Sequence, residues 1–238
     1  MNAMGIGLVV QARMSSSRLP GKVLKQMAGK PMLGWLLERM RRVDSVGRIV
    51  VATSRNEDDD GIADYAKSMN VSCFRGSLDD VLSRFQAVSQ KYKLDAVVRV
   101  NGDSPFLDPA IVRQAVGLFA ESDVDLVTNV FPRSFPTGQS VEVIARSAIE
   151  RAASDATTSE KEHVTAHFYA HSERYRILNF ASSRPYSWIQ MAVDTEADFT
   201  LAEKMVLSMT RPQVDYDLEA LLELRSALVP IAAAEGQR

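Results

Sequence analysis

Three cations lie close together in the N-terminal segment QARMSSSRLPGKVL: Arg13, Arg18 and Lys22. Serine hydroxyls and Gly21 are interleaved with them. Because this segment follows an apolar run, backbone N–H groups, hydroxyls and cations can all face an anion such as a triphosphate. The glycine spacings of a P-loop or of a dinucleotide-binding fingerprint are absent. Composition alone leaves a solvated basic loop as an equal alternative.

Two aspartates end apolar segments, where a carboxylate would lie at the edge of a sheet. Asp103 ends VRVNGD and Asp194 ends QMAVD. Carboxylates at such positions can hold Mg²⁺, which completes its shell with phosphates and water. Each aspartate alone also has a structural explanation, Asp103 as a turn residue and Asp194 as a helix N-cap. Together, opposite a cationic loop, they would form a metal-dependent phosphate site.

For other side chains that could be reactive, structural roles are the favoured interpretation. His163, His167 and His171 recur every four residues, so one helix face could carry all three, and histidines at that spacing can bind zinc. No third kind of ligand is evident beyond this stripe, so a helix surface or an interface is favoured. Cys73 lies in a strand-like run and is expected to be a buried, inert thiol. Residues 58–60, all aspartate, are typical of a solvated first helical turn.

The elements that would position these residues alternate through the first half of the chain. Strands are expected at 5–10, 48–53, 71–74 and 95–100, and helices at 31–43, 57–69, 78–92 and 109–120. Apolar strands without alternation indicate a parallel sheet covered by helices on both faces. In such a sheet, ligands bind at the carboxyl ends of the strands, where the basic loop and Asp103 both begin.

The second half is less regular. Strands are expected at 124–130, 140–145, 175–181 and 189–193, and helices at 160–171 and 196–208. The range of about 132–186 is interpreted as an arm inserted before the sheet resumes. We therefore expect a single nucleotide-binding domain over residues 1–238, with this arm as an insertion.

Composition excludes several classes of protein. The net charge of −2 argues against a general nucleic-acid binder. No apolar run approaches the roughly 20 residues that a membrane span requires. The first residues lack the pattern of a secretory signal, and the single cysteine cannot form an internal disulfide. These features predict a cytoplasmic protein without nucleic-acid or membrane partners.

The run Ala12-Arg13-x-x-Ser16-x-Arg18-Leu19-Pro20-Gly21-Lys22 resembles the signature of the CMP-sugar synthetases, a cytidylyltransferase family. This family includes the CMP-Kdo synthetases and the acylneuraminate cytidylyltransferases, and the chain most resembles the branch of the spore coat polysaccharide biosynthesis protein F. The resemblance covers about the first 200 residues and continues through FRGSLDDVLSRF, VRVNGDSPFLDP, PTGQSVEVI, EHVT and VDTEADF. The segment after about residue 211 matches nothing in it.

The resemblance implies a nucleotide-diphospho-sugar transferase fold (GT-A-like), which is an open three-layer α/β sandwich. Its sheet is mostly parallel, and the inserted arm makes a homodimer contact. The implied activity is transfer of CMP from CTP to an acidic, sialic-acid-like or Kdo-like sugar, with release of pyrophosphate. This places the enzyme in surface polysaccharide biosynthesis, with Mg²⁺ as cofactor.

The resemblance also assigns residues. Those that match the family's nucleotide contacts are Arg13, Ser16, Arg18, Lys22, Arg75, Gly76 and Asp103. Asp103 and Asp194 match the magnesium ligands. Arg13, Lys22 and Asp103 are the expected catalytic residues, and Glu142 falls near the sugar pocket.

Two other functions stay open. A glycosyltransferase with the same sandwich would consume a nucleotide sugar, and such enzymes usually place an Asp-x-Asp pair at the metal. This chain has Asn101-Gly102-Asp103 instead, which favours the cytidylyltransferase. A non-catalytic nucleotide-binding homologue is the second alternative.

Overall fold

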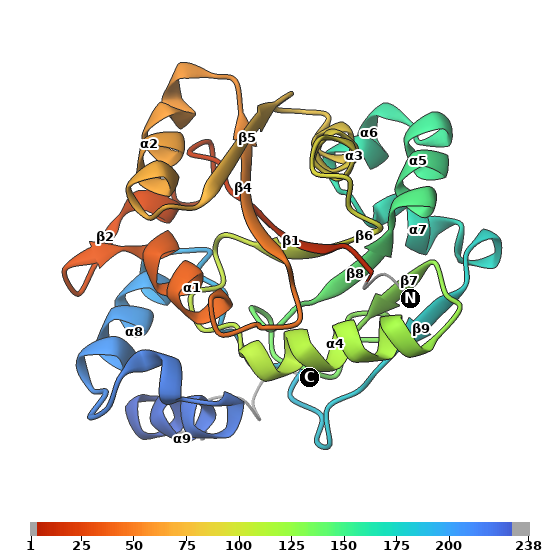
Figure 1. The fold of residues 1–238 in the computed structure, drawn as a ribbon. Coiled ribbons are helices and arrows are strands. Elements are labelled where there is room, and N and C mark those ends of the chain that lie inside the picture. The colour runs from red at the N-terminus through yellow and green to blue at the C-terminus, as the bar shows by residue number, and fades with distance from the viewer. Residues whose placement is uncertain (1–3, 230–238) are drawn as a thin grey trace.

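The fold is built around one seven-stranded sheet, in a computed structural model that describes residues 4–229 (Figure 1). The strands are β1 (Ile6–Gln11), β4 (Arg48–Ser54), β5 (Ser72–Gly76), β6 (Ala96–Asn101), β7 (Leu126–Thr128), β8 (Glu142–Ala145) and β9 (Ile177–Asn179). Their order is β5-β4-β1-β6-β8-β7-β9, and β8 alone pairs antiparallel to its neighbours. The expected mostly parallel α/β sandwich is confirmed.

Helices cover both faces of this sheet (Figure 1). One face packs against α1 (Met32–Met40), α2 (Asp60–Ser68), α4 (Pro109–Glu121), α8 (Glu196–Leu207) and α9 (Leu218–Leu228). The other packs against α3 (Val81–Lys91), α5 (Arg146–Asp155) and α7 (Ala166–Ala170), with α6 (Thr158–Glu162) beside α3 and α7. Buried side chains of β1 alternate between the two cores, Leu8 and Val10 facing one and Val9 the other, as strand geometry requires.

Short elements complete the chain. They are the hairpin strands β2 (Gln26–Met27) and β3 (Lys30–Pro31) and the 3₁₀ helices η1 (Lys22–Leu24), η2 (Glu57–Asp59), η3 (Ser172–Arg174) and η4 (Gln213–Asp215). Within the described residues, no helix is both long enough and apolar enough to cross a membrane.

The order of the strands reverses between β1 and β6. From β1 the chain runs outward through β4 to β5, and β6 then returns to the other side of β1. The register pairs Gln11 with Asn101, so the loops that follow these two strands leave the sheet next to each other. In open α/β sheets, a crevice at such a switch point is where ligands bind.

The second half departs from the sequence-based expectations. The predicted strand at 189–193 is wrong: its apolar residues are buried, but it makes only an isolated bridge from Gln190 to Thr137. The predicted helix at 160–171 is interrupted between α6 and α7. The range 132–186, expected to be an arm, contributes β8 and β9 to the main sheet. Its role in dimerisation stays a prediction.

The segment after residue 211 is anchored by the fully buried Arg39 of α1. Its guanidinium donates hydrogen bonds to the carbonyl oxygens of Leu107 (2.8 Å), Gln213 (2.6 Å) and Tyr216 (2.7 Å). Burial lowers the pKa of Arg39 to about 10, although Asp108 and Asp217 oppose the shift. Three carbonyl acceptors satisfy this cation, and η4 and α9 are thereby fixed against the loop that precedes α4.

Candidate nucleotide-binding site

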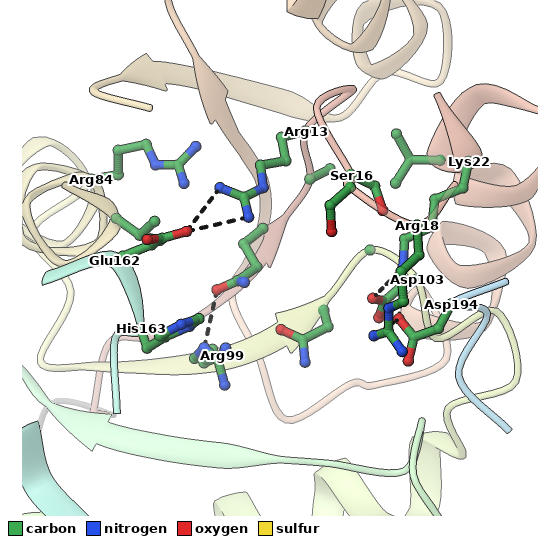
Figure 2. A pocket seen from close by; sticks show the side chains of 17 residues that line it. Arg13, Ser16, Arg18, Lys22, Arg84, Arg99, Asp103, Glu162, His163 and Asp194 are labelled. Atoms are coloured by element: carbon green, nitrogen blue, oxygen red, sulfur yellow. Dashed lines mark hydrogen bonds and ion pairs between the residues drawn. The ribbon is translucent and has the colours of Figure 1, made fainter. Parts of the chain in front are cut away.

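A cavity of about 340 Å³ lies at the carboxyl ends of β1 and β6. Figure 2 shows that its charged side chains form two groups. Arg18, Lys22, Asp103 and Asp194 gather at what we call the carboxylate end, and Arg13, Arg84, Arg99, Glu162 and His163 at the arginine end. The remaining lining residues are Gln11, Ala12, Ser16, Ser17, Val23, Val81, Asn101 and Gly102.

The basic loop is held in place by Asp59, which the sequence suggested to be solvated. Asp59 is only 2% exposed, and its carboxylate accepts hydrogen bonds from the Met14 N–H (2.8 Å), the Thr53 hydroxyl (2.9 Å) and the Ser54 N–H (3.0 Å). Burial favours its protonated form, but hydrogen bonds from Ser54, Met14 and Thr53 outweigh burial and lower the pKa of Asp59. The aspartate therefore ties the loop to the end of β4.

Two glycines let the loops after β1 and β6 approach each other and turn. Gly21 has φ 73°, a left-handed conformation that favours glycine, directly before η1 places Lys22. At Gly102, a Cβ atom would lie 2.9 Å from the carbonyl oxygen of Gln11, and the Gly102 N–H donates a 2.8 Å hydrogen bond to that oxygen. At Gly102, the absence of a side chain thus allows a close approach of backbone to backbone.

At the carboxylate end, the two distant aspartates contact one ammonium group. Lys22 Nζ donates to Asp103 Oδ2 (2.9 Å), to Asp194 Oδ1 (3.1 Å) and to the Val193 carbonyl oxygen (2.6 Å). Arg18 also pairs with Asp194 Oδ1 at 3.0 Å. Burial raises the pKa of Asp194, but Lys22 and Arg18 outweigh burial, so the net shift is downward. Since both carboxylates reach one nitrogen, they lie close enough to share a cation.

Neither carboxylate is used as a helix cap. Thr195 caps α8 and forms a capping box with Asp198, so the suggested capping role of Asp194 is wrong. Asp103 accepts from the hydroxyl of Ser104 at 3.2 Å, and within residues 4–229 no backbone N–H donates to it. Neither carboxylate is therefore committed to capping; their charged partners are the side chains of Lys22 and Arg18, and their hard oxygen donors suit Mg²⁺.

At the arginine end, Arg99 is fixed inside the sheet. Its Nε donates to Gln11 Oε1 at 3.0 Å, and its guanidinium forms an ion pair with the buried Glu142. The hydroxyl of Tyr169 donates to the other oxygen of Glu142, and burial followed by the charge of Glu142 raises the pKa of Tyr169. Glu142, the expected sugar contact, does not line the cavity. It holds Arg99, which does.

Arg84 extends from α3 toward Arg13 (Figure 2) and is only 3% exposed. Within the described residues, its Nε and Nη1 atoms have no hydrogen-bond partner, and neither does the Oδ1 atom of Asn101 in the same cavity. Burial lowers the pKa of Arg84 to about 10, and the charge of Arg13 acts in the same direction. Buried polar groups are normally paired, so these atoms point to a ligand that supplies the partners.

The expected contacts at Arg75 and Gly76 are not in the cavity. Arg75 donates to the carbonyl oxygens of Ser54 (2.9 Å) and Asn56 (2.8 Å) and pairs with Asp60 at 2.5 Å. Gly76 instead makes room for Arg84, because a Cβ at that position would lie 2.5 Å from its Cγ. Cys73, on the edge strand β5, is only half-buried, and burial raises the pKa of its thiol.

Glu162 and His163 line the cavity because the helix breaks after α6. Glu162 Oε1 lies 3.5 Å from both terminal nitrogens of Arg13, which closes one side of the arginine end. The helical spacing of the histidines concealed this break. Sequence reasoning also missed other lining residues, namely Gln11, Arg84, Arg99 and Asn101. For Arg99 a signal existed, since a cation within the apolar strand DAVVRV needs a buried partner or a ligand.

The fold places a cationic loop and paired carboxylates at its switch point, which suits an anionic ligand, and comparisons with known proteins identify the family. A family model described as Cytidylyltransferase matches residues 8–228. An uncharacterized protein of Methanocaldococcus jannaschii is 32% identical over 197 residues, covering 81% of this chain and 79% of the relative. The spore coat polysaccharide biosynthesis protein SpsF of Bacillus subtilis is 30% identical over 201 residues, covering 80% and 82%.

Among solved structures, a cytidylyltransferase from Leptospira borgpetersenii superposes with a TM-score of 0.90 at 28% identity. The match covers 94% of this chain and 95% of that one. The chain belongs to the cytidylyltransferase family. The family model extends to residue 228, so it also covers most of the C-terminal segment after residue 211 that the sequence motifs did not match.

Proposed function

We propose that this cytidylyltransferase joins the CMP group of CTP to a hydroxyl of an acidic sugar, with Mg²⁺ bound by Asp103 and Asp194. The observation that carries the proposal is the charge of one cavity. Five cations and three carboxylates line it, and two carboxylates face each other at one end. The resulting positive excess suits a triphosphate.

The reaction requires in-line displacement at the α-phosphorus of CTP. The sugar oxygen bonds to that phosphorus, the bond to the α–β bridging oxygen breaks, pyrophosphate leaves with the electron pair, and the hydroxyl proton passes to solvent. Arg13, Arg18 and Lys22 bind phosphate oxygens and hold the reacting atoms in line. When bound, Mg²⁺ neutralises charge that accumulates on those oxygens.

The acidic nature of the acceptor has separate support at the arginine end. Arg99 is oriented by Gln11 and Glu142, while Arg84, in the same space, has two nitrogens without a hydrogen-bond partner among residues 4–229. Arginine suits planar, bidentate recognition of carboxylates and phosphates. A role in surface polysaccharide synthesis is supported by the likeness to SpsF, and we infer a cytoplasmic reaction because CTP is supplied there.

The test is a matrix of nucleotides and acceptors. Purified protein with Mg²⁺ is given CTP, UTP, ATP or GTP, each with N-acetylneuraminate, Kdo or the neutral sugars mannose and glucose, and pyrophosphate release is measured. We expect release with CTP that depends on an acidic sugar, and its loss when EDTA replaces Mg²⁺. Mass spectrometry of the product identifies the CMP-sugar.

Each other outcome overturns a defined part of the proposal. Release with neutral sugars only contradicts the acidic acceptor. Release with UTP and not CTP contradicts the nucleotide. Binding of CTP by calorimetry without turnover on any acceptor in the panel supports the non-catalytic homologue instead.

A further inference from the structure

We propose that Glu160, His167 and His171 form a binding site for a zinc-class divalent metal, separate from the nucleotide cavity. The ligand atoms of these three side chains all lie within 4.8 Å of one another. Two imidazole nitrogens and a carboxylate oxygen form a donor set that zinc accepts, with a fourth position open to water. This inference does not depend on the proposed function.

The helix break that moves His163 into the cavity is what assembles the cluster. The three histidines do not form one stripe, because α6 ends at Glu162 and α7 starts at Ala166. As a result Glu160 of α6 lies against the two histidines that follow. His171 Nε2 lies 3.1 Å from Glu160 Oε1, and His167 Nδ1 lies 3.4 Å from Glu160 Oε2. With bonds of about 2.0–2.2 Å to zinc, these two separations suit neighbouring ligands of one ion, while the two histidine nitrogens, within 4.8 Å of each other, would need to be brought closer by the metal.

The strongest indication is His167. Its side chain is 1% exposed, and within residues 4–229 neither of its ring nitrogens has a hydrogen-bond partner. Buried imidazole nitrogens are normally paired, but within these residues Nε2 of His167 has no partner and Nδ1 has only the 3.4 Å contact with Glu160 Oε2. A metal bound to the nitrogen that faces Glu160 would satisfy it. His171 is 38% exposed, which provides a path from solvent.

Glu160 is prepared to act as a charged ligand. Its Oε2 accepts hydrogen bonds from the backbone N–H and the hydroxyl of Thr157, both at 2.8 Å, as part of the capping box of α6. Ligating carboxylates in metal sites are commonly oriented by hydrogen bonds of this kind.

Such a site would fix the position of α6 relative to α7. Glu162 and His163, two and three residues beyond Glu160, line the nucleotide cavity. Metal binding would therefore order the segment that closes the arginine end, and its expected effect is structural.

The test measures zinc on the full chain prepared without a histidine tag, stripped with EDTA and desalted. Excess Mg²⁺ is present, so that Asp103 and Asp194 do not contribute. We expect one zinc per chain by elemental analysis after gel filtration, and a dissociation constant of about 1 µM or below by competition with a chromophoric chelator. Cobalt should give the visible absorption of a low-coordinate N/O site, and saturating zinc should raise the Tm by about 5–10 °C.

Variants locate the site. His171→Ala, at a partly exposed position, and Glu160→Gln, which keeps a side chain compatible with the capping box, should each weaken zinc binding about a hundredfold or more. His163→Ala and Cys73→Ser are the controls and should bind zinc as the wild type does. Circular dichroism checks that every variant is folded.

The proposal is overturned if the wild type retains less than about a tenth of an equivalent of zinc, in which case the cluster is only an ion-paired network. It is also overturned if folded His171→Ala and Glu160→Gln keep wild-type affinity, or if His163→Ala or Cys73→Ser abolishes binding.

Discussion

The two ends of the cavity are built from different parts of the chain. The carboxylate end comes from connecting segments: Asp103 follows β6, Asp194 follows an apolar segment, and Lys22 begins the short helix η1 in the connection after β1. At the arginine end, two of the three arginines come from regular elements, Arg99 from β6 and Arg84 from α3, while Arg13 comes from the loop after β1. Their electrostatic states also differ. The loop charges pair with one another, whereas Arg84 keeps two nitrogens without partners among the described residues.

Because of this difference in charge pairing, substitutions at Asp103 and Arg84 can change the stability of the protein and its activity independently. At the carboxylate end, removing one charge breaks an existing ion pair and also removes a ligand-binding group. At the arginine end, Arg84 lowers the stability of the free protein and contributes only when a ligand supplies its partners. We therefore expect substitutions of Asp103 and of Arg84 to change stability in opposite directions while both reduce activity.

Asp103→Asn should have the largest effect on activity. Loss of one carboxylate weakens metal and phosphate binding together, so kcat/KM for CTP should fall by about 10³-fold. Stability should also fall by about 1–3 kcal/mol, since the buried Lys22 loses a charged partner. Pyrophosphate release and urea unfolding measure the two effects. Asp64→Asn, at an exposed site on α2, is the matched control. Turnover within threefold of the wild type would remove Asp103 from the active centre.

Arg84→Met should separate the two properties most clearly. Methionine keeps an apolar stem and removes a buried, unpaired cation, so the free energy of unfolding should rise by about 1–2 kcal/mol. At the same time, kcat/KM should fall about 10–100-fold for the ligand that Arg84 contacts, CTP or the sugar. Steady-state kinetics with each substrate varied in turn identifies that ligand. Arg184→Met, at an exposed position, is the control, and a less stable but fully active Arg84→Met would contradict the comparison.

The same contrast explains what the sequence could reveal. Polar residues after apolar strands stand out, so the basic loop, Asp103 and Asp194 were identifiable. The spacing of Thr195 and Asp198 also indicated a capping box, which means that Asp194 is not needed as the N-cap of α8. Arg84 could not be recognised as a site residue from the sequence. A cation on an amphipathic helix is predicted to be solvent-exposed unless the segment that packs over it is known.

Prediction of the fold from the sequence was limited in the same way, because it depended on local patterns. The local apolar pattern defined the first strands and their helices. It predicted a strand at 189–193, but this segment does not join the sheet. Strand pairing depends on distant parts of the chain, which a local pattern does not describe. Nor could it show that Asp59, within an acidic run, is buried under the basic loop.

Asp59→Asn tests how that loop is anchored. The pKa of Asp59 is lowered in the folded state, so its charge contributes stability that is present above its unfolded value and lost as pH falls through the folded value. We expect a loss of about 1–3 kcal/mol that is constant from pH 7 to about 5 and shrinks below about pH 4. Urea unfolding across this range measures it, with the exposed neighbour in Asp58→Asn as control. A loss that grows toward low pH would reverse the assigned sign.

Arg75→Ala should have the smallest effect on catalysis, although resemblance placed Arg75 among the nucleotide contacts. Its guanidinium is engaged by the carbonyl oxygens of Ser54 and Asn56 and by Asp60, away from the cavity lining. Losing these half-exposed contacts should lower stability by about 1 kcal/mol. The KM for CTP should stay within about twofold of the wild type, because no phosphate or base contact is removed. A tenfold rise in KM at unchanged kcat would instead show that Arg75 leaves those carbonyls for the nucleotide, and that the arginine end includes β5 when CTP is bound.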